Sequence, residues 1–396
     1  MRPSLVSIPA VLLALAGRPT APPNEHASFV TTLGRDTVVI ESFTRTATKL
    51  DGDMVVRVPG TVICHYELDL GSSGNITKSV VDVKPVSAAN VAPRHVTLNY
   101  VGDSLRVDVD SAGMHSQFVR AVEKNAYPQF MTGFGSSYGL YSSLGVYEVL
   151  FAQLGAKFDS ATIPSIDMQS GRTVKRDFVR RSPTTIDADY FRIAWTHLTL
   201  DDSGQIVSAD ADQTTEKTKT QRTAYIDPQK VAKQFASDDK SGKGLGIASP
   251  SVTEKATLGG KLVVVLYSSP RRRNRTILGN VVPFGQVWRT GANQATVLVT
   301  DDGFDIGGTS VPAGSYSLWT EPKKDGSVDL IVNGQYGQWG TNYDSTRNVA
   351  RVPMKASTAS SPQENFTINI APTNGNGGEM KIAWDTFVWT VPITMK

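Results

Sequence analysis

The 396-residue sequence contains a single cysteine, Cys64, and only five histidines, which excludes several kinds of site. One cysteine cannot form an intramolecular disulfide, and its strand-like surroundings predict a buried thiol. His65 is adjacent to Cys64, but neighbours in one strand point to opposite faces and cannot act on a common atom. No histidine has a partner at metal-ligand spacing, so the sequence predicts no metal site and no cofactor.

Charge and long apolar runs are also scarce. Charged residues make up 19% of the chain and the formal net charge is +3, which argues against a dedicated nucleic-acid-binding protein. The longest apolar run of the N-terminus is too short to span a bilayer, so no transmembrane segment is expected. Lys-Glu helical patterning is rare while Thr, Ser and Gly abound, and this composition favours strands. The composition makes no prediction of oligomeric state.

The first residues have the pattern of a secretory signal. Arg2 supplies an early positive charge, an apolar run follows, and Ala14-Leu15-Ala16 ends it with small residues. We therefore predict a signal peptide over residues 1–16, a flexible stretch over residues 17–36, and export to the periplasm or the extracellular space. The alternative is an N-terminus that is disordered or part of the core.

Residues 37–236 are expected to form an antiparallel β meander with one packed helix. Leu105, Val107 and Val109 alternate with charged residues, which places one face of a strand in a core. Asp51-Gly52 predicts a hairpin turn. Apolar residues at helical spacing predict a helix near residues 140–157, and a helix across a curved meander can enclose an apolar cavity.

A second helix and a linker follow. Asp227-Pro228 is a typical helix start, with an N-cap aspartate before proline. Residues 237–251 are small, polar and glycine-rich, and we expect the domain boundary there. The basic run of residues 271–275 is interpreted as solvated charge, with a phosphate or acidic-polymer site as the alternative.

Residues 252–396 are expected to form an antiparallel β-sandwich-like domain, because several strands alternate apolar and polar residues. The segment from Ile277 to Thr300 is dense in glycine and proline around Trp288, Arg289 and Asn293. One interpretation is a structural corner, in which Trp288 packs, Arg289 binds carbonyls and Asn293 caps a turn. The other is a ligand-binding loop.

Three motifs of this region resemble the bacterial domain-of-unknown-function family 2911. They are VWRTGANQAT (residues 287–296), VPAGSYSLWTEP (residues 311–322) and VNGQYGQWG (residues 332–340). The resemblance covers roughly the last third of the chain and implies a β-sandwich-like domain of exported bacterial proteins without an established activity. Thr276 stands where the family usually has arginine. Gln294 replaces the usual glutamate, so a general-base role is not expected at that position.

The sequence contains no complete catalytic set, since residues 252–396 lack histidine and cysteine. We expect a non-catalytic ligand-binding or scaffold protein of the cell envelope. The alternatives are a carrier of an apolar ligand in the N-terminal domain, and a hydrolase acting on envelope polymer or carbohydrate. The expected ligand is a carbohydrate or an apolar small molecule, and the candidate binding residues are Trp288, Arg289, Asn293, Gln294, Asn333, Trp339 and Tyr343.

Overall fold

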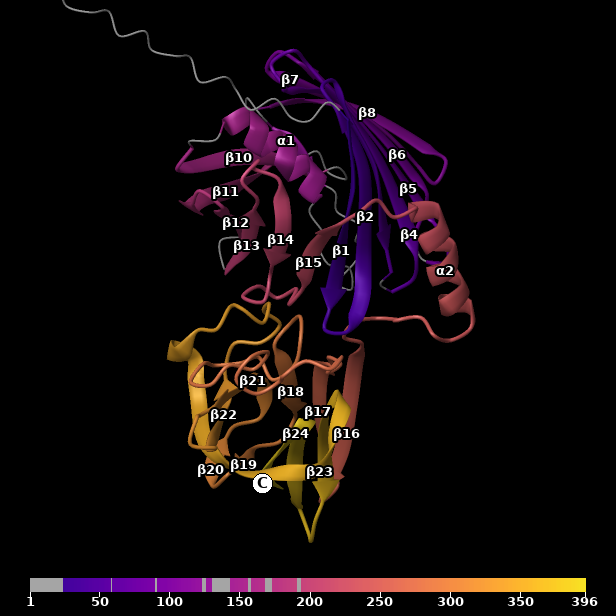
Figure 1. The fold of residues 1–396 in the computed structure, drawn as a ribbon. Coiled ribbons are helices and arrows are strands. Elements are labelled where there is room, and N and C mark those ends of the chain that lie inside the picture. Colours follow the sequence, from indigo (N-terminus) through magenta and orange to yellow (C-terminus); the bar gives the residue numbers. More distant parts are fainter. Residues whose placement is uncertain are drawn as a thin grey trace, which may run out of the picture.

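The computed structural model describes residues 24–57, 59–89, 91–122, 126–129, 143–155, 158–167, 173–190 and 194–396. Over these ranges the protein is mainly β, as predicted, with one antiparallel sheet in each half of the chain (Figure 1). No helix in the described ranges is both long enough and apolar enough to cross a membrane. The predicted signal peptide lies outside the described residues.

Fifteen strands of the described residues form the first sheet, in the order β8-β7-β6-β5-β4-β3-β2-β1-β15-β14-β13-β12-β11-β10-β9. Neighbours are antiparallel except β9 and β10, so the predicted meander is confirmed. The strands are β1 (Asn24–Leu33), β2 (Asp36–Thr46), β3 (Lys49–Val56), β4 (Val62–Leu70), β5 (Ile76–Pro85), β6 (Arg94–Val101), β7 (Ser104–Ser111), β8 (Met114–Ala121), β9 (Tyr127–Gln129), β10 (Ser160–Asp167), β11 (Thr173–Ser182), β12 (Thr185–Tyr190), β13 (Ala194–Leu200), β14 (Ile206–Asp210) and β15 (Lys219–Thr223).

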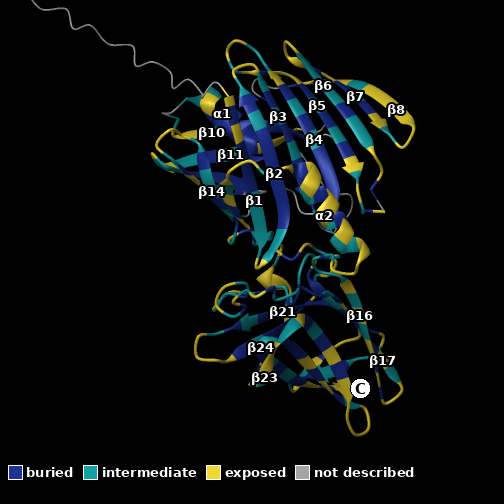
Figure 2. Cartoon of the chain, turned by 45° about the vertical axis from the view of Figure 1, so that its right-hand side comes forward, coloured by how far each residue is buried: buried dark blue, intermediate teal, exposed yellow. Residues whose placement is uncertain are grey.

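The first sheet curves around helix α1 (Leu144–Leu154), which lies between its two halves (Figures 1 and 2). The helix is apolar on nearly all sides and is buried from Leu144 to Phe151, as a helix in a core must be. Its aromatic residues pack edge to face on Phe178 of β11, with ring centroids 5.2 Å away for Tyr147 and 5.5 Å for Phe151. The predicted helix is therefore confirmed within its described part, and it ends at Gly155 as expected.

The predicted hairpin at Asp51-Gly52 is wrong, because both residues lie inside β3. Gly52 stands directly opposite Tyr66 of β4. A Cβ atom on Gly52 would lie 2.5 Å from Tyr66 Cζ, so the missing side chain makes room for the tyrosine ring. The turn between β2 and β3 lies instead at residues 47–48, where the sequence has no glycine.

The flexible stretch predicted over residues 17–36 is wrong from Asn24 onward, where β1 begins and pairs with both β2 and β15, and residues 17–23 lie outside the described residues. Helix α2 (Pro228–Lys240) begins at the predicted N-cap, where Asp227 Oδ1 accepts from Gln229 N–H at 2.9 Å. Ala232 packs on Val55 and Ile63, on the outer side of the first sheet. The helix extends into the predicted linker, which leaves residues 241–250 between α2 and the next strand.

The second sheet has the order β16-β17-β18-β21-β22-β23-β24-β19-β20. Strands β23 and β24 bend through two register shifts and carry the sheet back over itself, which gives the expected sandwich-like domain with a shared apolar interior. Its elements are β16 (Ser251–Leu258), β17 (Lys261–Ser268), β18 (Thr296–Thr300), β19 (Phe304–Ile306), β20 (Thr309–Val311), β21 (Gly314–Pro322), β22 (Val328–Asn333), the 3-10 turn η1 (Ser345–Arg347), β23 (Asn348–Pro372) and β24 (Gly377–Met395).

The two domains meet where the β1–β2 turn contacts the basic run of residues 271–275. The interpretation of this run as solvated charge is wrong, because Arg273 is only 1% exposed and pairs with Asp36. The backbone N–H of Arg35 donates to the carbonyl of Arg273 at 3.0 Å. Gly34 permits this contact, since its φ is +60° and a Cβ atom would overlap that carbonyl.

We expect Gly52→Ala to destabilise the N-terminal domain by about 1–3 kcal/mol, the usual cost of forcing extra volume into a packed interior. The added methyl group would displace Tyr66, whose hydroxyl donates to Glu41 at 2.6 Å. Urea unfolding followed by circular dichroism measures the change. Gly303→Ala is the matched control, because its Cβ would make only ordinary contact, 3.5 Å from Lys396 Cδ. Equal stability of the two variants would contradict the assigned role of Gly52.

Candidate functional site

A cavity of about 70 Å³ lies inside the first sheet, beside helix α1. Apolar side chains form much of its wall, among them Phe29, Val39 and Met54 from the strands and Leu144 and Tyr147 from the helix. The wall also carries an unusual number of polar groups for the interior of a β domain. These are Thr31, Glu41, Arg176, Asp189, Thr196, Glu216, Thr218 and Thr220.

Glu41 on β2 binds the N-terminus of α1. One carboxylate oxygen accepts from the backbone N–H of Leu144 at 2.9 Å, and the other accepts from Gly145 at 3.3 Å. Ser143 and Tyr66 donate their hydroxyls to the same group. Burial raises the pKa of the Glu41 carboxyl group, while these hydrogen bonds lower it. The first N–H groups of a helix have no acceptor within the helix, and Glu41 supplies that acceptor inside the apolar interior.

Glu148 is the only charged residue of α1, and it fixes the middle of the helix to the strands. Its Oε1 accepts from the backbone N–H of Ile206 at 2.7 Å and from Arg222 at 2.8 Å. Its Oε2 lies 3.2 Å from Arg45, and Glu25 pairs with both arginines. Burial raises the pKa of Glu148 to about 7, although Arg45 lowers it. Two acids and two arginines therefore form one buried cluster beside the cavity.

Arg176 brings a guanidinium group to the cavity wall, and Glu216 brings a carboxyl group. Arg176 is buried on β11 and donates to the carbonyl of Asp189 at 3.2 Å. Glu216 is half-buried as a residue, but its Oε1 atom is buried and has no hydrogen-bond partner among the described residues. Burial raises the pKa of Glu216 to about 8 against the lowering effect of Arg176. Glu216 is therefore mainly protonated at neutral pH and can donate a hydrogen bond into the cavity.

Sequence reasoning did not select these residues, although two patterns could have indicated them. Glu41 lies between Val39 and Phe43 on the inward face of its strand, and Arg176 lies two residues before the inward Phe178. A charge on an apolar strand face is a signal of a buried partner or a site. Glu216 follows no such pattern, because it lies in the β14–β15 connection and only the fold brings it to Arg176.

The C-terminal candidate Trp288 lies in the core of the sandwich-like domain. It stacks on Trp384 with ring centroids 6.2 Å apart and meets the ring of Phe366 edge to face at 5.4 Å. Its backbone N–H and carbonyl both bond to Thr320 on β21, at 2.8 and 2.9 Å. These contacts are those of the structural corner.

Arg289 and Asn293 shape the same corner. Asn293 has a φ of +59°, and its carbonyl accepts from the backbone N–H of Gly340 at 3.0 Å. A Cβ atom on Gly340 would overlap Arg289 Cδ, so the arginine side chain packs directly against that glycine. Asparagine tolerates the left-handed backbone conformation better than most residues, which explains its position here.

The remaining candidates separate into buried and exposed groups. Asn333 is fully buried, and its amide donates to the Asp344 carbonyl at 2.8 Å and to Asn348 at 2.9 Å. Tyr343 donates to the same Asn348 side chain at 3.0 Å and packs on Trp319. Gln294 and Trp339 are exposed and form an isolated β bridge. Of the seven candidates, these two present the most open surface.

Trp288→Ala should destabilise the C-terminal domain by about 3–5 kcal/mol, because it removes a buried aromatic side chain and leaves a cavity. Trp339→Ala is the matched substitution at a side chain that is 38% exposed, and we expect a cost of about 1 kcal/mol or less. Chemical unfolding followed by tryptophan fluorescence compares them. Similar costs would mean that Trp288 is not the packing centre of the corner.

Comparison with known proteins identifies only the C-terminal region. No curated protein matches the chain. Among solved structures, a DUF1089 family protein from Pseudomonas aeruginosa aligns over 43% of this chain and 89% of its own, at 12% identity. The TM-score of that alignment is 0.29, which is too low to support a structural argument. Residues 249–393 match the model of the family DUF2911, described as a protein of unknown function, which confirms the resemblance in the last third of the chain.

Proposed function

We propose that this protein is an exported, non-catalytic ligand-binding protein whose site is the cavity inside the first sheet. Its ligand is a small, mainly apolar molecule with one polar or anionic group. The observation that carries the proposal is the presence in the cavity wall of Arg176 and of a Glu216 carboxyl oxygen that has no hydrogen-bond partner among the described residues. Export is inferred from the signal-like pattern of the first sixteen residues.

The polar groups of the cavity wall indicate a ligand-binding site and not merely a gap in the packing of the core. Buried polar atoms are nearly always hydrogen-bonded, and an unmet one costs about 1–3 kcal/mol. A ligand oxygen that accepts from protonated Glu216 would remove this cost. An anionic group would also gain from Arg176, whose planar guanidinium suits carboxylates. The two residues together therefore favour a ligand end that is a carboxylic acid or a similar group.

The apolar part of the wall limits the size of the ligand. An engineered cavity of about 150 Å³ lined by apolar side chains binds benzene, so the present volume holds a smaller group. Phe29, Val39, Met54 and Leu144 can surround a short aliphatic chain. Among the described residues, the cavity lining includes neither histidine nor cysteine, which favours binding over acyl transfer.

Propanoate and propanol are suitable probes, because they share one short chain, are smaller than benzene and differ in charge. We expect propanoate to bind wild-type protein, and Arg176→Met to weaken that binding by about tenfold or more, the value of a lost charge-assisted hydrogen bond. Propanol binding should change little in the same variant. Isothermal titration calorimetry measures both.

Two further variants complete this experiment. Lys175→Met removes a charge from the exposed neighbour of Arg176 on β11 and should leave propanoate binding unchanged. Ala188→Leu adds volume to the cavity wall and should weaken both probes. If neither probe binds, or if Lys175→Met and Arg176→Met behave alike, the cavity is not the binding site.

The protonation of Glu216 predicts a pH dependence of stability. Its pKa in the folded protein is about 8, above the ordinary value of 4.5, so the folded state binds more protons between these values. The contribution of Glu216 to the free energy of unfolding is fully present below about pH 4.5 and is lost as the pH rises through about 8. In Glu216→Gln the free energy of unfolding should not show this decrease. Thermal unfolding across the range compares the two proteins, and parallel curves would contradict a neutral Glu216.

A second candidate function rests on the C-terminal surface. Tyr336 and Trp339 are 58% and 38% exposed in one glycine-rich loop, beside the exposed Gln294. Aromatic faces next to amide groups suit sugar rings and their hydroxyls. Carbohydrate binding by this loop is expected to be lost in Trp339→Ala, and a glycan array with wild-type protein as reference tests it.

A further inference from the structure

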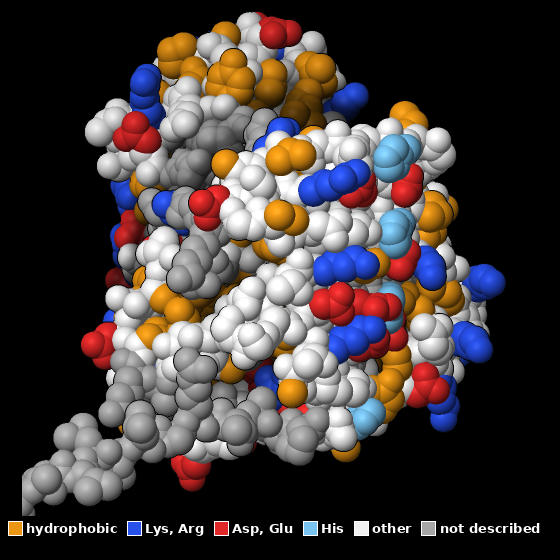
Figure 3. All heavy atoms as spheres, turned by 90° about the horizontal axis from the view of Figure 1, so that it is seen from above, with side chains coloured by type: hydrophobic (Ala, Val, Ile, Leu, Met, Phe, Trp, Pro, Cys, Tyr) orange, Lys and Arg blue, Asp and Glu red, His pale blue; other side chains and the backbone are white. Residues whose placement is uncertain are grey.

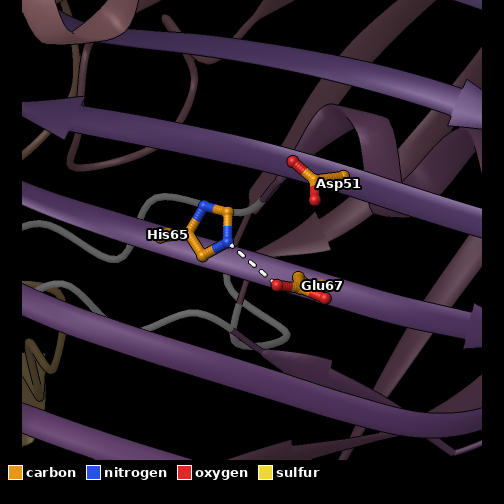
Figure 4. Close-up of side chains that lie close together, drawn as sticks. All are labelled: Asp51, His65 and Glu67. Carbon is orange, nitrogen blue, oxygen red and sulfur yellow. Dashed lines mark hydrogen bonds and ion pairs between the residues drawn. The ribbon is translucent and has the colours of Figure 1, made fainter.

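We infer that the outer face of strands β3 and β4 carries a site for a divalent transition-metal ion, ligated by Asp51, His65 and Glu67 (Figure 4). One ligand atom of each residue lies within 4.8 Å of the other two. An imidazole nitrogen with two carboxylate oxygens is a donor set that Zn²⁺ accepts, whereas Mg²⁺ and Ca²⁺ prefer oxygen alone. The cavity lies on the inner face of the same sheet, so this inference is independent of the proposed function.

The strand register brings these ligands together. Asp51 stands directly opposite Glu67, and Asp53 stands directly opposite His65. Alternation then places all four side chains on one face, while Gly52 and Tyr66 point inward. The ligands come from the middle of two paired strands rather than from loops, which holds their Cα positions in place.

Asp53 gives His65 the orientation that a metal ligand needs. The Nδ1 atom of His65 lies 3.2 Å from Asp53 Oδ1, and the Nε2 atom faces Glu67 Oε1 at 3.3 Å. A histidine that binds a metal usually donates its other ring N–H to a carboxylate, which fixes the tautomer. With Nδ1–H donating to Asp53, the Nε2 atom faces Glu67 Oε1 (Figure 4), and a metal ion bound between them would take the place of the Nε2 proton.

The local charge also fits a divalent cation. Asp51, Asp53 and Glu67 carry three negative charges, and Lys49 supplies one positive charge, 2.5 Å from Glu67 Oε2 and 3.8 Å from Asp51 Oδ2. When Nε2 binds a metal ion in place of a proton, His65 is neutral and the excess is two negative charges, which one divalent ion neutralises. The Lys49 side chain is 41% exposed, so it can leave Glu67 when a metal ion enters.

Other histidines of this face provide an internal comparison. In Figure 3 the histidine side chains form a line along one side of the molecule, among acidic and basic side chains. His95 lies 3.0 Å from Asp82 and His115 lies 2.8 Å from Asp110, in the same cross-strand arrangement as His65 and Asp53. Within the described part of the chain, only the group at His65 gathers three possible ligands.

The test uses the full chain, freed of metal with a chelator and titrated with Zn²⁺ alone by isothermal titration calorimetry. We expect one ion per chain, loss of that binding in His65→Gln, and unchanged binding in His95→Gln. Asp53→Asn should weaken binding by about 10–100-fold, the usual effect of removing the group that orients a ligand histidine. Lys49→Met should strengthen binding, because it removes the competing cation.

Co²⁺ provides a second measurement that a purely structural role would not affect. Its visible absorption bands should report nitrogen and oxygen ligation in wild-type protein and be absent in His65→Gln. Circular dichroism checks that each variant is folded, and Lys49→Met gives a gain of affinity that misfolding cannot imitate. Absence of Zn²⁺ binding to wild-type protein, or equal binding in His65→Gln and His95→Gln, would overturn the inference and leave an ion-paired cluster around Lys49.

Discussion

Helix α1 can lie inside the first sheet only because two glutamates make the hydrogen bonds and ion pairs that its buried polar groups need there. Glu41 accepts from the first N–H groups of the helix, and Glu148 pairs with Arg45 and Arg222 on the strands. Loss of Glu41 would leave buried N–H groups of the helix without this acceptor, and loss of Glu148 would leave the two arginines with Glu25 as their ion-pair partner among the described residues. Removing one partner of a buried polar interaction costs more than the pair itself contributes. The curved sheet and its core are built around this anchored helix.

The same arrangement explains why the candidate site lies in the N-terminal domain. A sheet that wraps a helix anchored by polar groups brings charged side chains inside, and Arg176 and Glu216 line the cavity that remains. The C-terminal domain instead stacks Trp288, Phe366 and Trp384 across its bent sheet. Its open surface is therefore found in loops such as the one that carries Trp339.

Contact between the domains depends on a buried arginine. Arg273 has a φ of +51° and lies at the junction, where it pairs with Asp36 while the carbonyl of Arg273 accepts from Arg35. Its Nε and Nη2 atoms lack hydrogen-bond partners among the described residues, so only part of the hydrogen-bonding capacity of this guanidinium group is used at the junction. Burial lowers the pKa of Lys217, and the charges of Arg289 and Arg275 lower it further, so the connection that carries Glu216 lies near these residues of the C-terminal domain. The cavity wall and the domain junction thus share one loop.

The sequence alone determined what depends on neighbours along the chain: the alternating strands, the start of α2 at Asp227, the apolar helix near Tyr147 and the motifs around Trp288. Those features follow from local periodicity and capping. Tertiary structure alone decided that Gly52 makes room for Tyr66, that Arg273 is buried, and that Glu216 meets Arg176. Strand register and domain contact set these pairings between residues distant in sequence, and no spacing rule along the chain records them.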